Sequence, residues 1–356
     1  MKETGKSLLI GSIGGGIFFL LDLPLAWMLG SMCIATVFAV RGVQMHVDAT
    51  LRKVMTAVLG VMLGSSFSAD TVQSLIGWSG GLLLLVLSIF LSMGVVYVFY
   101  RKFCNFDRIT SYFSASPGGF NIMYEAGEAA GGDGRTIALV HATRILLLVM
   151  VIPLVFNYGL TFENTGNAVT HSIWGDPTQL KDYVLLALAG VVGYFGGTKL
   201  KLPAPHLMGP LVVVAALHVV DISSSEPPMI LVYAAQLVIG TAIGLRFLGS
   251  SFREVRRIIL ISCVSTSLMM VVVVFLAYEA TSLISVSIPG LVLALAPGGL
   301  AEMALVALAL GIDVAFVSVM HVVRIMLIIA LIPALYPVTQ QAWRIKDRLF
   351  KGQPPA

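Results

Sequence analysis

The chain has 356 residues, of which 58% are hydrophobic and only 11% are charged, and its mean hydropathy is +0.94. Because soluble domains carry about 25% charged residues, this composition excludes an ordinary soluble protein and indicates an integral membrane protein. The formal net charge of +4 does not indicate a nucleic-acid binder, since the basic residues stand in small clusters between apolar segments. Cys33, Cys104 and Cys263 have no paired spacing, so they predict neither a disulfide framework nor a metal cluster.

Apolar runs such as Gly80–Tyr100, Ile137–Phe156 and Ile258–Tyr278 are close to the length of about 20 residues that a membrane-spanning helix needs. In the first half we expect helices at about 7–21, 25–40, 54–68, 76–100 and 134–157. Between the last two lies a mixed stretch, 107–132, that is interrupted at Ser116-Pro117-Gly118-Gly119. Pro-Gly-Gly is a turn signal and not a helix interior. The link 159–182 is polar.

The second half repeats this order of segments. The predicted helices are 183–198, 204–220, 229–247, 256–278 and 314–336, with a broken stretch at 283–311 before the last of them. A basic segment, 338–356, follows, and we expect it to form a cytoplasmic tail.

Eight residues recur at a fixed offset of 180 positions, without a gap. They are Pro117, Gly118, Gly119, Met123, Asp133, His141, Arg144 and Pro153, matched by Pro297, Gly298, Gly299, Met303, Asp313, His321, Arg324 and Pro333. A period this long indicates two duplicated halves and not a solenoid. We therefore divide the chain into a first membrane repeat, 7–158, and a second membrane repeat, 183–337.

The broken stretches decide the topology. Each arm has about 10–14 residues, which as helix covers about half of a bilayer. Either the stretch is a re-entrant hairpin, or it is one discontinuous helix that crosses. With hairpins, each half has five crossings and the second half is inverted, and an inside N-terminus then places nearly all of the 22 Lys and Arg residues inside. The crossing alternative would put the clusters Lys199/Lys201 and Arg253–Arg257 outside, against the positive-inside rule.

The predicted fold is thus an all-α polytopic membrane protein with two inverted-topology repeats, each of five transmembrane helices plus a re-entrant helical hairpin. Both termini are expected on the cytoplasmic side of a bacterial inner membrane. Inverted repeats with non-helical backbone near the midplane are typical of secondary transporters.

Helix 134–157 and its counterpart carry the His-x-x-Arg pairs His141/Arg144 and His321/Arg324. At 1.5 Å per residue these side chains lie about 12 to 16 Å from the start of the helix, near the bilayer centre. A charged residue at this depth costs at least about 2.5–3.5 kcal/mol, so each arginine is a functional candidate.

The tips of the hairpins predict an anion site without a metal. Each tip opens a helical arm, whose first N–H groups are unpaired and whose dipole is positive at that end. We expect the solute to be bound by Gly118, Gly119, Asn121, Gly298, Gly299, Arg144 and Arg324. We expect a coupling proton or sodium ion to be carried by Glu125, Glu302, His141 and His321.

Simpler structural roles remain open for the same residues. The arginines can pair with Glu125, with Glu302 or with hairpin carbonyls and so hold the halves together. The histidines can be structural hydrogen-bond partners, and Asp133 and Asp313 are suited to N-capping. The Gly-x-x-x-Gly pairs Gly60/Gly64 and Gly240/Gly244 suit close helix packing.

The duplicated Pro-Gly-Gly … Asp … His-x-x-Arg … Pro pattern resembles the bacterial membrane proteins of the AbrB-duplication family. Members are described as AbrB family transcriptional regulators or as ammonia monooxygenases, so the resemblance implies a role in gene expression or a metal-dependent oxidation. The polar links of this chain, of about 20 residues, are too short for a DNA-binding module. The sequence has no His pair at i, i+4, which is a spacing that would favour a metal site. The hairpin architecture also resembles elevator-type secondary transporters.

The sequence therefore predicts a secondary transporter of a small anionic, carboxylate-bearing solute, and not an enzyme. It predicts no cofactor, no metal and no nucleic-acid partner; the partners are the solute, a coupling proton or sodium ion and the lipid bilayer, and a homo-oligomer is left open. The alternatives are a membrane sensor that regulates gene expression through a partner and a metal-dependent monooxygenase.

Overall fold

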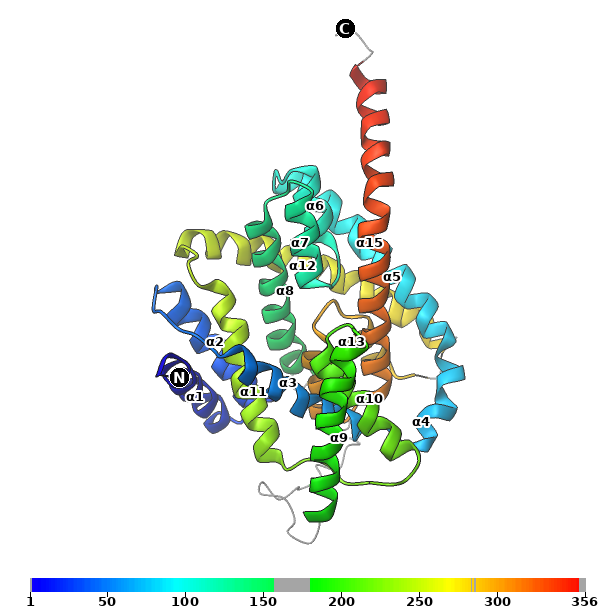
Figure 1. The fold of residues 1–356 in the computed structure, drawn as a ribbon. Coiled ribbons are helices and arrows are strands. Elements are labelled where there is room, and N and C mark those ends of the chain that lie inside the picture. Colours follow the sequence, from blue (N-terminus) through cyan, green and yellow to red (C-terminus); the bar gives the residue numbers. More distant parts are fainter. Residues whose placement is uncertain (1, 157–179, 283, 285, 352–356) are drawn as a thin grey trace.

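The computed structural model describes residues 2–156, 180–282, 284 and 286–351. Within these ranges the regular elements are helices, and six of them are long and apolar enough to cross a membrane (Figure 1). They are Ser79–Phe103, Gly134–Leu154, Leu180–Lys199, Met229–Phe247, Phe252–Glu279 and Val314–Gln341. Helices Ala26–Val40 and Pro205–Val219 are apolar but shorter. The prediction of an all-helical membrane protein is confirmed at this level.

The first half contains eight α-helices and the 3-10 helix η1 (Leu75–Trp78) in the described part of the chain. The α-helices are α1 (Lys2–Leu20), α2 (Ala26–Val40), α3 (Ala49–Gly64), α4 (Ala69–Ser74), α5 (Ser79–Phe103), α6 (Arg108–Ala115), α7 (Phe120–Ala129) and α8 (Gly134–Leu154). Aspartates define three of the starts, because their carboxylates accept backbone N–H groups of the first turn: Asp48 for α3, Asp107 for α6 and Asp133 for α8. The Leu51 N–H also lowers the pKa of the exposed Asp48 carboxyl.

The second half contains α9 (Leu180–Lys199), α10 (Pro205–Val219), α11 (Met229–Gly244), the 3-10 helix η4 (Leu245–Phe247), α12 (Phe252–Glu279), α13 (Ile288–Leu295), α14 (Leu300–Ala309) and α15 (Val314–Lys351). The pairs α6/α13, α7/α14 and α3/α11 begin and end at the 180-residue offset. Both predicted interruptions are present, since non-helical residues 116–119 and 296–299 separate the arms.

Three predicted helix boundaries are wrong by five or more residues, and the first is the start of α1, which lies at Lys2 and not near residue 7. Helix α3 begins at Ala49 and not near 54, because Asp48 caps it inside the polar link. Helix α15 continues through Lys351, past the predicted end at 336 and in spite of Pro333 and Pro337. Its extension packs on the first half, where Trp343 stacks on Tyr97 at 6.0 Å between ring centroids. Figure 1 shows the last turns of α15 extending away from the other helices.

The helices pack into two bundles, and each bundle draws on both halves of the chain (Figure 1). In the first, which we call the scaffold bundle, α2 packs on α1 and α11, and α10 packs on α9 and α3. In the second, the hairpin bundle, α12 packs on α5 and α8, while α6, α7, α13 and α14 pack on α8 or α15. The bundles meet where α14 and α15 contact α3 and where α8 contacts α2 and η4.

Glycines let the scaffold helices approach one another at backbone distance. A Cβ atom on Gly14 or Gly30 would overlap the backbone of the other glycine, and Gly193 and Gly209 repeat this contact in the second half. Gly60 lies against the Leu207 carbonyl, as Gly240 lies against the Met28 carbonyl. The packing role predicted for the Gly-x-x-x-Gly pairs is therefore confirmed, and it joins helices of different halves.

We expect Gly30→Ala to lower the free energy of unfolding by about 1–3 kcal/mol, because its methyl group overlaps the backbone of α1 at Gly14. Thermal unfolding of the purified protein in detergent measures the effect. Gly16→Ala is the matched control on α1, since no atom lies within 4 Å of the added methyl group. Equal melting temperatures for the two variants would contradict the close packing.

Candidate functional site

Arg144 projects from α8 to the point where α6 ends. Its Nη1 donates to the Ser116 carbonyl and its Nη2 to the Ser114 carbonyl, both at 2.6 Å. Carbonyls in the last turn of a helix have no intrahelical partner and carry the negative end of the dipole. The guanidinium group therefore satisfies the end of α6, and the side chain is only 1% exposed.

Arg324 does the same at the end of α13. Its Nη1 donates to the Ala296 carbonyl and its Nη2 to the Gly298 carbonyl. The Nη2 also lies 2.8 Å from His321 Nδ1, and this residue too is 1% exposed. Of the two carbonyls, Ala296 is the counterpart of Ser116 in the repeat, so one contact recurs unchanged.

The two histidines bind the same hairpins one turn earlier. His141 Nε2 lies 3.0 Å from the Phe113 carbonyl, and His321 Nε2 lies 2.9 Å from the Leu293 carbonyl. Because a guanidinium group can only donate, His321 Nδ1 accepts and Nε2 carries the hydrogen that reaches Leu293. The His-x-x-Arg pairs thus take the structural contacts that the sequence left open, with hairpin carbonyls and not with glutamates.

The first tip lies against helix α15 of the other half. A Cβ atom on Gly118 would be 3.2 Å from Ile328 Cδ1 and 3.7 Å from Arg324 Nε. Gly118 and Gly119 have φ angles of +154° and +69°, in the left-handed region that favours glycine. Arg144 and Arg324 are near enough to interact electrostatically. The structure therefore brings the first tip and both arginines together.

The predicted acids are not equivalent. Glu125 lies on α7 and is exposed. Glu302 lies in the first turn of α14, and its carboxylate folds back over Gly299, so that a Cβ atom on Gly299 would overlap Oε2. The carboxylate also accepts the N–H of its own residue. Glu302 therefore covers the N-terminus of α14, where we expected a solute. The side chain of Asn121 lies outside the described residues.

Arg246 and Phe120 also belong to this region, and the sequence analysis did not select them. The Arg246 guanidinium carbon lies 4.3 Å from the centroid of the Phe120 ring, at the first residue of α7. The charge of Arg246 interacts with Glu302 and with His141. In the repeat, the position of Arg246 is occupied by Ser66. A search for charged residues that break the repeat would have found it.

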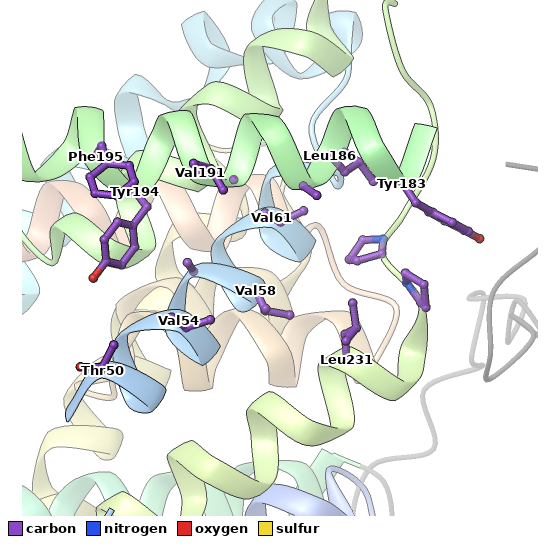
Figure 2. A pocket seen from close by; sticks show the side chains of 15 residues that line it. Thr50, Val54, Val58, Val61, Tyr183, Leu186, Val191, Tyr194, Phe195 and Leu231 are labelled. Atoms are coloured by element: carbon purple, nitrogen blue, oxygen red, sulfur yellow. The ribbon is translucent and has the colours of Figure 1, made fainter. Parts of the chain in front are cut away.

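A cavity of about 620 Å³ lies elsewhere, between α3, α9 and the start of α11 (Figure 2). Its lining is apolar, with Val54, Val58, Leu186 and Leu231 among the residues that face it. None of the predicted site residues lines it, and its chemistry suits hydrocarbon and not an anion. Among the described residues, no group of three or more His, Cys, Asp or Glu side chains is arranged to hold a metal ion.

Comparison with known proteins gives matches over nearly the whole chain. The family model described as "Transition state regulatory protein AbrB" matches residues 27–340. The chain is similar to YhjN of Bacillus subtilis (strain 168), with 30% identity over 348 residues, covering 92% of this chain and 90% of that protein. It is also similar to "Putative regulator AbrB" of Escherichia coli (strain K12), with 27% identity over 332 residues and 92% of each chain covered.

We expect Arg144→Ala to destabilise the protein by at least about 1.5–3 kcal/mol, because the Ser114 and Ser116 carbonyls lose a charged donor in a buried place. Arg135→Ala is the control, since it removes an arginine from the same helix whose side chain is 57% exposed and pairs with Glu254 at 2.6 Å. A surface pair of this kind contributes about 0.2–1 kcal/mol. Thermal unfolding in detergent compares the two, and an equal or smaller loss for Arg144→Ala would contradict the role assigned here.

Proposed function

This chain belongs to the AbrB family, and we propose that it is a secondary transporter of the bacterial inner membrane that moves a small carboxylate-bearing anion by alternating access. The observation that carries this proposal is the pair of helix breaks, each closed by a buried arginine. Arg144 and Arg324 have no carboxylate partner in the described part of the chain. Two positive charges beside broken helices deep in an apolar protein favour a negatively charged solute.

In this proposal the tips bind the solute and the arginines act from behind them. Backbone N–H groups at Gly118, Gly119, Asn121 and Gly299 point to the anion, since the first N–H groups of a helix are unpaired. The N–H of Gly298 donates instead to the Ala296 carbonyl at 2.8 Å. Arg144 and Arg324 fix the tip carbonyls and add positive potential. A proton or sodium ion couples through Glu125, Glu302, His141 or His321, and the glutamates are better placed, because the histidines already bind carbonyls.

Alternating access needs one part of the protein to move against another. The scaffold and hairpin bundles supply such parts, because the packing within each bundle is more extensive than the packing between them. We further propose that the repeats are inverted and that α6/α7 and α13/α14 are re-entrant hairpins that enter from opposite faces. The distribution of Lys and Arg supports this orientation.

A second candidate is a membrane regulator of gene expression that acts through a partner. The names of the matched family and of the Escherichia coli relative favour it. This candidate predicts a regulatory phenotype that survives when transport is abolished, and a cytoplasmic protein that is recovered by crosslinking. A phenotype that follows transport activity in every variant would remove it.

We expect opposite labelling of cysteines placed at the bases of the two hairpins. In a variant without the natural cysteines, Lys102→Cys at the end of α5 should react with an impermeant maleimide only from the cytoplasm. Thr281→Cys, before α13, should react only from outside. Both positions are exposed, and permeabilised cells, in which both must react, are the control. Labelling of both from the same side would contradict the inverted arrangement.

We expect proteoliposomes that contain the protein to take up at least one of radiolabelled acetate, succinate and glutamate under a proton or sodium gradient. Arg144→Lys and Arg324→Lys keep the charge but lose the planar group that reaches two carbonyls at once. We expect each to lower uptake at least about tenfold, a change of about 1.4 kcal/mol in the barrier. Arg135→Lys is the matched control. Wild-type uptake in both variants would contradict the proposed site.

A further inference from the structure

Three arginines lie at the hairpin tips, and only one of them is available to a ligand. Arg144 and Arg324 are 1% exposed and donate to backbone carbonyls. Arg246 is exposed, and its guanidinium group rests on the ring of Phe120 at the start of α7. A cation held over an aromatic face keeps its N–H groups free at the edge of the plane. Arg246 therefore presents donors beside the first tip.

The surroundings of Arg246 carry more positive than negative charge. Arg52, on α3, is exposed and near enough for its charge to interact with that of Arg246. Glu302 is a carboxylate whose charge acts on Arg246. Two neighbouring guanidinium groups repel each other, and one carboxylate neutralises only one of the two charges. A bound anion would neutralise the other. The counterparts of Arg52 and Arg246 in the repeat are Val232 and Ser66, so this cluster exists on one side only.

Glu302 occupies the place that a carboxylate ligand would take. Its side chain folds back over Gly299 at the start of α14, with the charge of Arg246 acting on it. No direct salt bridge joins Glu302 and Arg246 within the described residues. The carboxylate is therefore held by α14 and attracted by Arg246 without being fixed to it, which leaves it able to move away.

We infer that Arg246 is the residue that binds the carboxylate of the solute, and that Glu302 is a tethered competitor that leaves when it is protonated. This rests on the proposed transport function and assigns its anion contact. One proton from water binds one oxygen of the Glu302 carboxylate, and the neutral side chain gives up Arg246. The solute carboxylate takes its place. Release of the solute allows Glu302 to lose that proton and return.

The other titratable groups on the elements that pack against α14 do not compete for this role. His141 and His321 bind hairpin carbonyls, as do Arg144 and Arg324. Arg52 cannot give up its proton at ordinary pH. Glu302 therefore remains as the group through which pH acts on the site.

This site lies between the two bundles. Arg246 and Arg52 come from the scaffold bundle, whereas Phe120 and Glu302 come from the hairpin bundle. The attraction between Arg246 and Glu302 thus joins the parts that have to move. Exchange of Glu302 for a solute carboxylate transfers that attraction to the solute, so one proton accompanies each bound carboxylate group. In the proposed orientation, Arg52 and Arg246 lie on the cytoplasmic side, so that the site is accessible from the cytoplasm.

Calorimetric titration of the purified full-length protein with acetate, succinate and glutamate at pH 5 and pH 7.5 tests the inference. We expect the wild type to bind at least one of them more tightly at pH 5, by up to about tenfold per pH unit. Glu302→Gln should bind that probe equally well at both values. Arg246→Gln should bind it at least about tenfold more weakly at both. Arg253→Gln, which removes a nearby exposed charge from α12, should behave as the wild type.

Gly299→Ala provides a second test that keeps every charge. Its φ of −80° is compatible with alanine. The three atoms nearest to the added methyl group all belong to the Glu302 carboxylate, and two of them would be closer than 3.0 Å. We expect this variant to lose the pH dependence, as Glu302→Gln does.

The outcomes separate this inference from the transport proposal. Unchanged binding in Arg246→Gln, or a pH dependence retained in both Glu302→Gln and Gly299→Ala, would overturn the inference and leave the proposed transport standing. No binding of any of the three probes by the wild type at either pH would contradict the anionic solute, and this inference would fall with it.

Discussion

The structure depends on the capture of helix-end carbonyls by buried arginines. Each broken stretch ends a helix inside an apolar protein, where carbonyls without partners cost several kcal/mol each. Arg144 and Arg324 supply charged donors to Ser116 and Ala296, which are equivalent positions of the repeat. The cost of burying each guanidinium group is offset in part by the same contacts, since both Nη groups donate to carbonyls, whereas the buried Nε of each arginine has no acceptor among the described residues. The break and the arginine therefore stabilise each other, and neither is tolerable alone.

The duplication explains how two such breaks come to lie together. Each half contributes its first three long helices to the scaffold bundle and its last four α-helices to the hairpin bundle, and glycine contacts such as Gly60 with Leu207 join helices of different halves. In a single half, these glycines would have no helix of the other half to pack against. The halves are therefore units of sequence, whereas the bundles are units of packing, and a relative motion can occur between the bundles without separating the halves.

Much of this could be predicted from the sequence, because the repeat marks it. The positions of the breaks and of the His-x-x-Arg pairs follow from identities at one offset. The start of α8 follows from Asp133, because an aspartate at this position can cap a helix. The direction of the long arginine side chains could not be predicted, since both a ligand and a carbonyl satisfy a guanidinium group. The length of α15 could not be predicted either, because Pro333 and Pro337 suggest that the helix ends there. The helix continues instead, and Trp343 in its extension packs on Tyr97. Arg246 was not predicted, because the site residues were chosen mainly from positions that are identical in both halves, and Arg246 has no identical counterpart.

That difference between repeated and unrepeated residues separates architecture from chemistry. The repeated residues, including both His-x-x-Arg pairs, hold two similar hairpins in place. A solute with one carboxylate is not symmetric, so a site that recognises it needs residues that only one half supplies. Arg246, Arg52, Phe120 and Glu302 are of this kind, with Ser66, Val232, Leu300 and Ile122 at the equivalent positions. Even the tips differ, because Gly118 and Gly119 adopt left-handed conformations whereas Gly299 does not. In the proposed function, these departures from the repeat are the positions where a single ligand would contact a duplicated architecture.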